Sequence, residues 1–113
     1  MASKQSQKRE KRIDWFAEVK TPPLPLSVRR KIGFHLRDLQ EGKSLPMPHS
    51  RPMPSIGARV HELRVQDSDQ TWRLIYRVDE KAIVVLEVFS KKTQQTPKPV
   101  IDLCKKRISR YDS

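Results

Sequence analysis

The fold is decided by three stretches of the chain, RVHELRVQ at residues 59–66, TWRLIYRV at 71–78 and AIVVLEVFS at 82–90. Each stretch is rich in the β-branched, aliphatic and aromatic residues that strands favour. Polar turns at 67–70 and 79–81 separate them, and turns this short connect antiparallel neighbours. The three stretches therefore predict an antiparallel meander, with the third as a central strand because 82–86 is apolar on both faces.

Two amphipathic helices are expected, one before and one after the meander. Ser27 can cap the first, and Gly42 is placed to end it in the left-handed conformation. The second follows Thr96 and Pro97, a capping residue and then the residue favoured in a first turn. The apolar faces consist of Val28, Ile32, Leu36 and Leu39 in the first helix and Val100, Cys104, Ile108 and Tyr111 in the second.

The rest of the chain is less regular. Residues 1–12 contain almost no apolar side chain, so they predict a flexible basic arm ahead of a single domain at 13–113. Apolar residues alternate over 13–19, which favours a short half-buried strand. Residues 43–57 carry four prolines and predict a loop that is neither strand nor helix.

The charge balance points to a polyanionic partner. The 113 residues include 24 Lys and Arg against 13 Asp and Glu, a net charge of +11. The longest apolar run, 82–86, is too short to span a membrane, and the single cysteine excludes an intrachain disulfide. His35, His49, His61 and Cys104 lack metal-ligand spacing, so we expect a cytoplasmic basic domain with no metal and no cofactor.

Cationic side chains are concentrated on the expected sheet. Alternation places Arg64 beside Glu62 on one face of the first strand. In the second strand it places Arg73 and Arg77 on the face opposite to Tyr76 and its apolar neighbours. An arginine among apolar strand residues needs an anionic partner, which predicts either a bound anion or a structural ion pair.

Lys91 and Lys92 follow the third strand and bring two more cations. If Arg64, Arg73 and this lysine pair converge, they form a pocket for one phosphodiester. His61 or Tyr76 would then be near enough to transfer a proton. Plainer alternatives are that Arg73 pairs with Glu62 or Glu87, that His61 and Tyr76 belong to the strand and core, and that the lysines are solvated.

The sequence also resembles a known group of proteins over residues 26–111. The motifs are HELRVQDSDQTWRLIYRV at 61–78 and IVVLEVFSKKTQQTPKPVIDLCKKRISRY at 83–111, of which FSKKTQQTP is the most specific. They resemble the phage-related, HigB-like branch of the RelE/ParE toxin superfamily. The resemblance implies an α+β fold, with helices packed on one side of a twisted antiparallel sheet, and a toxin that a cognate antitoxin silences.

Many relatives in the RelE and HigB branches cut translated mRNA in the ribosomal A site. By this resemblance Arg73 is the expected phosphate-stabilising residue and Arg64 the arginine of the ELR motif. His61 is the expected proton carrier, which completes the catalytic set. The expected RNA-binding residues are Lys91, Lys92, Arg77 and Tyr76.

Three functions remain open from the sequence. The first is a ribosome-dependent mRNA endoribonuclease, in which the ribose 2′-hydroxyl attacks the adjacent phosphate. The second keeps the fold but poisons DNA gyrase, as ParE relatives do. The third is a non-catalytic module that only holds an antitoxin or nucleic acid. In each case the expected partner is a helix-turn-helix antitoxin, with the ribosome and mRNA added for the first.

Overall fold

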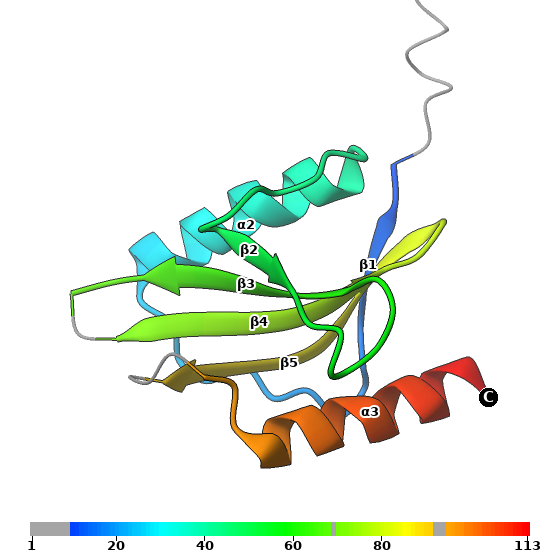
Figure 1. Cartoon of the computed structure of the whole chain (residues 1–113). Helices are drawn as coiled ribbons and strands as arrows, with labels where there is room; N and C mark the ends of the chain where they lie inside the picture. The colour runs from blue at the N-terminus through cyan, green and yellow to red at the C-terminus, as the bar shows by residue number, and fades with distance from the viewer. Residues whose placement is uncertain (1–9, 69, 92–94) are drawn as a thin grey trace, which may run out of the picture.

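The computed structural model describes residues 10–68, 70–91 and 95–113. Its strands form one five-stranded sheet in the order β1-β5-β4-β3-β2, and its two helices lie on either side of that sheet (Figure 1). This architecture confirms the α+β class. The elements are β1 (Arg12–Trp15), α2 (Leu26–Gln40), β2 (Ser50–Pro52), β3 (Val60–Gln66), β4 (Thr71–Val78), β5 (Ala82–Lys91) and α3 (Lys98–Asp112).

The predicted meander is confirmed. β3, β4 and β5 pair antiparallel in sequence order, with Arg64 opposite Arg73 and Glu62 opposite Ile75. β5 is an interior strand, because β4 pairs with one of its edges and β1 with the other. A bulge shifts the register of β4 against β5 between Ile75 and Tyr76.

β1 differs from the expected strand in length and direction. It ends at Trp15 and pairs parallel to β5, so the sheet is mixed rather than antiparallel. The chain turns after Phe16, where the Val19 amide donates to the Phe16 carbonyl. Residues 1–9 of the predicted basic arm lie outside the described residues, but Lys11 belongs to the fold, since its Nζ lies 2.7 Å from the carbonyl oxygens of residues 79 and 80.

β2 lies inside the segment that was expected to form only a loop. Its three residues pair antiparallel with β3, with Ser50 opposite Leu63 and Arg51 opposite Glu62. Pro52 has no amide hydrogen, but it is tolerated because β2 is an edge strand. The main chain of an edge strand forms hydrogen bonds with one neighbouring strand only. The four prolines of 43–57 therefore predicted a loop over the whole segment, and this prediction was wrong for the three residues of β2.

The helices cover opposite faces of the sheet, so the expectation of helices on one side was wrong. α2 packs on Leu63, Leu74 and the residues beside them, and we call this side of the sheet the α2 face. Cys104 of α3 packs on Ile75 and its neighbours, and this side is the α3 face. β5 supplies apolar residues to both cores: Ile83, Val85 and Val88 to the α2 face and Ala82, Val84 and Leu86 to the α3 face. Because both faces of the central strand are apolar, both need a cover.

The helix ends also depart from expectation. α2 begins at Leu26 after Pro25 and α3 at Lys98 after Pro97, and neither has a side-chain cap. Gly42 has a φ of +89°, which confirms the left-handed stop after the first helix. Within the described residues, neither helix is long and apolar enough to cross a membrane.

Candidate functional site: an arginine cluster around Glu62

Three strands bring three arginines around one carboxylate. β2 places Arg51 opposite Glu62, and β3 and β4 place Arg64 opposite Arg73. All four side chains lie on the α3 face, because side chains of directly paired residues project to the same side of a sheet. We call Arg51, Glu62, Arg64 and Arg73 the arginine cluster.

Glu62 is the centre of this cluster. Its side chain has no exposed surface, and its Oε1 lies 3.2 Å from Arg51 Nε and 3.8 Å from Arg64 Nε. Its Oε2 accepts hydrogen bonds from Arg73 Nη1 at 3.5 Å and from the Thr96 hydroxyl at 2.7 Å. Thr96, the predicted helix cap, thus anchors the segment before α3 to the sheet.

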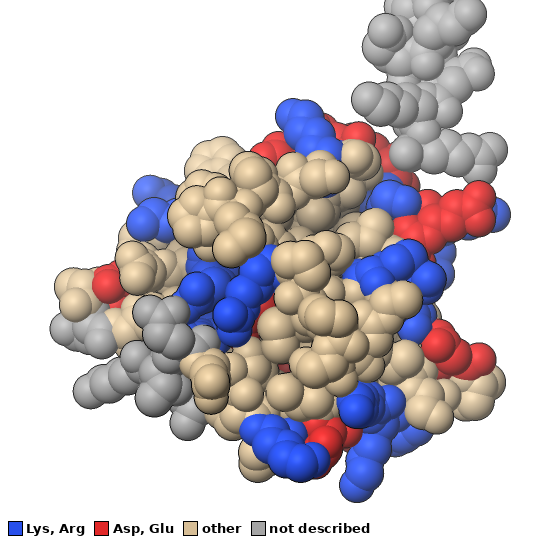
Figure 2. Space-filling view, viewed as in Figure 1, with Lys and Arg blue, Asp and Glu red and all other residues tan. Residues whose placement is uncertain are grey.

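The arginines differ in their access to solvent. Arg51 and Arg64 keep 30% and 23% of their side-chain surface exposed, whereas Arg73 keeps 1%. Figure 2 shows basic side chains gathered over the strands between the two helices, with little acidic surface among them. Among the residues that the structure describes, three guanidinium groups face the carboxylate of Glu62, so the four side chains of the cluster together carry a net charge of +2. An open cationic surface of this kind suits a phosphate group.

Burial lowers the pKa of Arg73, while the attraction of Glu62 opposes that shift. The pairing with Glu62 confirms the alternative in which Arg73 takes part in an ion pair. Arg73 therefore lies beneath the exposed surface of the cluster, and Arg51 and Arg64 form that surface.

His61 and Tyr76 lie on the α2 face, away from the arginine cluster. They pair across β3 and β4, and their rings stack at 5.4 Å between centroids. The Tyr76 hydroxyl shares a hydrogen bond of 2.6 Å with Ser50 Oγ, and burial raises the pKa of Tyr76. The structure therefore does not bring these two residues together with Arg64 and Arg73.

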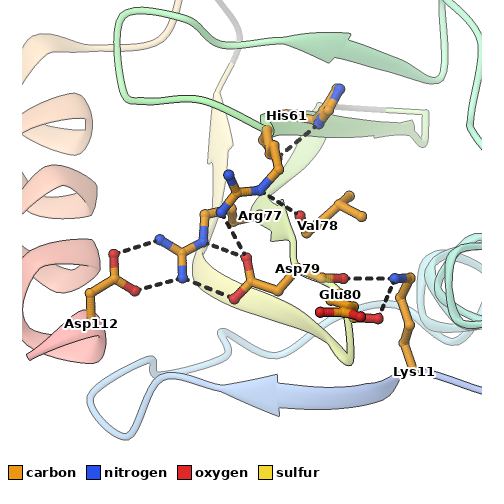
Figure 3. A network of polar contacts seen from close by, with 8 residues as sticks. Lys11, His61, Arg77, Val78, Asp79, Glu80 and Asp112 are labelled. Carbon is orange, nitrogen blue, oxygen red and sulfur yellow. Dashed lines mark hydrogen bonds and ion pairs between the residues drawn. The ribbon is translucent and has the colours of Figure 1, made fainter.

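Arg77 serves as a structural clamp. Its guanidinium binds the carboxylates of Asp79, at the end of β4, and of Asp112, at the end of α3 (Figure 3). These bonds are 2.7–2.9 Å long, and the hydrogen bonds that Arg77 donates to Asp112 are the main reason that its pKa is raised. Arg77 also lies over the ring of Tyr111, at 5.7 Å. Its contacts thus fasten α3 to the sheet.

The lysine pair is only partly defined. Lys91 ends β5 opposite Thr71, at the same end of the sheet as the Arg64–Arg73 pair. Its side chain and the whole of Lys92 lie outside the described residues. Their predicted contacts with RNA therefore stay a prediction.

Sequence reasoning missed Arg51 and the central place of Glu62. Arg51 lies in a proline-rich segment that has no apolar alternation, so nothing in its neighbours indicates a strand. Glu62 was placed beside Arg64 by alternation, and its burial among three arginines follows from strand pairing. Within the described residues, no group of three or more His, Cys, Asp or Glu side chains could hold a metal ion.

Comparison with known families identifies the chain. Residues 22–109, which make up most of the chain, match the family model described as "Phage derived protein Gp49-like (DUF891)". The protein therefore belongs to the Gp49-like family, a phage-derived family of RelE/HigB-like toxins of toxin–antitoxin systems. No curated protein matches the sequence.

Proposed function

We propose that this member of the Gp49-like toxin family is an endoribonuclease that cuts mRNA on the ribosome, with the arginine cluster holding the scissile phosphodiester. The observation that carries the proposal is the arginine cluster itself, whose four side chains carry a net charge of +2 and whose members Arg51 and Arg64 are partly exposed on the α3 face. Guanidinium groups bind phosphate oxygens through two parallel hydrogen bonds, which fixes the orientation of the phosphate as well as its charge.

The cluster suits the transition state of RNA cleavage better than the ground state. Attack by the 2′-hydroxyl gives a phosphorane with one more negative charge than the starting phosphodiester, and fixed cations stabilise that added charge. Arg51 and Arg64 contact the phosphate in this proposal. Arg73 acts as a positioning residue, since it is buried against Glu62 and holds the carboxylate that orients the other two arginines.

Partners follow from the same charges. A net charge of +11 favours association with ribosomal RNA, and contacts of Lys91 and Lys92 with the mRNA are part of the proposal. A helix-turn-helix antitoxin with an acidic surface would silence the toxin by covering the arginine cluster. Tyr76 and Arg77 belong to the scaffold in this proposal, because their polar atoms already bind Ser50, Asp79 and Asp112.

The test is primer-extension mapping of mRNA 5′ ends after induction in a bacterial host. Arg51→Gln and Arg64→Gln are the variants, because these side chains are partly exposed and their removal leaves Arg73 paired with Glu62. Each should reduce cleavage roughly 100-fold, as the loss of one transition-state donor does. Lys105→Gln removes the same charge from the exposed face of α3 and should leave cleavage unchanged.

The outcomes separate the three candidate functions. New ends inside translated codons that disappear in both arginine variants support the endoribonuclease. Growth arrest with intact mRNA and trapped gyrase–DNA complexes would contradict it in favour of gyrase poisoning. Absence of growth arrest from the wild-type protein would leave only a non-catalytic module.

A further inference from the structure

A cleft adjoins the arginine cluster between α2 and the edge of the sheet. Its volume is about 590 Å³, within the range of sites that hold nucleotide-sized ligands. Arg64 belongs both to the lining of the cleft and to the arginine cluster, so the two features meet at this residue. The rest of the lining is Lys31, Phe34, His35, Pro48, His49, Val65, Gln66 and Thr71.

Two imidazoles face each other in this cleft. The ring centroids of His35 and His49 are 4.9 Å apart, and their planes are tilted by 40°. His35 is half-buried on α2, between the core residues Ile32 and Leu36. The main chain of His49 is attached to the sheet, since its carbonyl accepts a hydrogen bond of 2.8 Å from the Arg64 amide. Both rings are thus carried by well-anchored backbone.

We propose that His35 and His49 are the general base and general acid of the RNA-cleaving reaction, and that the cleft binds the nucleotide on which they act. This inference rests on the proposed function, because it names the groups that transfer protons at the site of cleavage. It replaces the expectation that His61 carries the proton, since His61 is not part of the cleft lining. The arginine cluster reaches the reacting phosphate through Arg64.

The reaction balances with these two groups and no co-reactant. Neutral His35 accepts the proton of the ribose 2′-hydroxyl as that oxygen forms a bond to phosphorus. The bond between phosphorus and the 5′-oxygen of the next nucleotide breaks, and protonated His49 donates a proton to that leaving oxygen. The products are a 2′,3′-cyclic phosphate and a free 5′-hydroxyl, and the extra charge of the transition state falls beside Arg64.

Two other residues of the cleft suit a nucleotide. Phe34 keeps 73% of its surface exposed, compared with 45%, 54% and 70% for the exposed Trp15, Leu26 and Met47. An exposed aromatic ring stacks on a base of single-stranded RNA. Lys31 lies one helical turn before His35 and adds a cation for the phosphate backbone.

The charges around His35 favour its role as the base. Burial lowers the pKa of His35, and the neighbouring His49 lowers it further, while Asp38 on the same helix opposes the shift. Lys31 and Arg64 also line the cleft and add positive charge to it. A neutral imidazole at physiological pH is the form that accepts a proton.

The experiment uses purified full-length protein, ribosomes translating a defined mRNA, and single-turnover cleavage rates. His35→Gln and His49→Gln should each lower the maximal rate roughly 100-fold or more, with the half-saturating toxin concentration unchanged. Phe34→Ala should instead raise that concentration. Lys105→Gln is the surface control, and His61→Gln tests the competing proton carrier. Thermal unfolding of each variant checks that it folds.

Three further readouts distinguish catalysis from a structural effect. The wild-type product should carry a 2′,3′-cyclic phosphate. The maximal rate should rise with pH through the pKa of His35, because the base must be neutral, and His35→Gln should lose this rise. Folded His35→Gln and His49→Gln proteins that cut at the wild-type rate, or a loss confined to His61→Gln, would overturn the inference alone. A wild-type protein that cuts no translated mRNA would overturn the proposed function and the inference together.

Discussion

Replacing Glu62 by glutamine should destabilise the fold strongly, because it removes a buried negative charge that lies among three arginines. The change keeps the size of the side chain, and the new amide oxygen can still accept the hydrogen bond of the Thr96 hydroxyl. The side chain of Arg73 has 1% of its surface exposed, and its guanidinium would lose the ion pair with Glu62. Breaking a buried ion pair in this way costs about 3–5 kcal/mol.

This magnitude is a large fraction of the total stability, since folded domains are stable by about 5–15 kcal/mol. Arg51 and Arg64 contribute less to the loss, because both are partly exposed and solvent screens their charges. With a dependence of about 1–3 kcal/mol per molar urea, the unfolding midpoint should fall by about 1 M or more.

Urea unfolding followed by tryptophan fluorescence measures the effect, because Trp72 is buried against the α2 core. Glu80→Gln changes an exposed turn residue in the same way and should shift the free energy of unfolding by less than about 0.5 kcal/mol. The double variant Glu62→Gln, Arg73→Met should recover much of the loss, since it removes both charges of the pair. A Glu62→Gln midpoint equal to that of Glu80→Gln would refute the buried counter-ion.

Two further predictions concern α3. Tyr111→Phe removes the hydrogen bond of 2.6 Å to Asp14, which is the main reason that the pKa of Asp14 is lowered, and should cost about 1 kcal/mol at pH 7. A carboxyl group with a lowered pKa stabilises the fold above its unfolded pKa of about 4, and this effect is lost as the pH falls through the folded pKa. The difference between the two proteins in urea titrations should therefore shrink as the pH falls below about 4, and a difference that stays constant would contradict this account. Burial raises the pKa of Cys104 to about 12, so a thiol-specific reagent at pH 8 should label it only in the unfolded protein. Rapid labelling of the native protein would show that Cys104 is not buried between α3 and the sheet.

Much of the fold could be predicted from the sequence because its signals are local. The meander follows from three apolar stretches joined by short polar turns, and Gly42 lies at the left-handed stop. The parallel pairing of β1 with β5 joins residues about 70 positions apart, and no local pattern encodes it. The same holds for β2, whose three residues form a strand only because the edge of β3 is there to pair with them.

The candidate site divides in the same way. Side-chain alternation predicts which face of β3 carries Arg64 and which face of β4 carries Arg73. The pairing of β3 with β4 puts these two faces on the same side of the sheet, so the proximity of the two arginines could be predicted from the sequence. Alternation could not show that His61 faces away from them, because it does not relate the faces of two strands until their register is known.

What the sequence determined by itself is the composition and the local elements: a basic chain, two amphipathic helices, a central apolar strand and the motifs typical of a toxin family. The tertiary structure alone decided which charges meet. It buried Glu62 among three arginines from three different strands and set His35 of a helix beside His49 of a loop. The physical reason is that the periodicity of a helix or strand depends on residues two to four positions apart, whereas a site depends on contacts between distant segments. Bringing distant segments together costs chain entropy, and only the packing of the complete core offsets that cost.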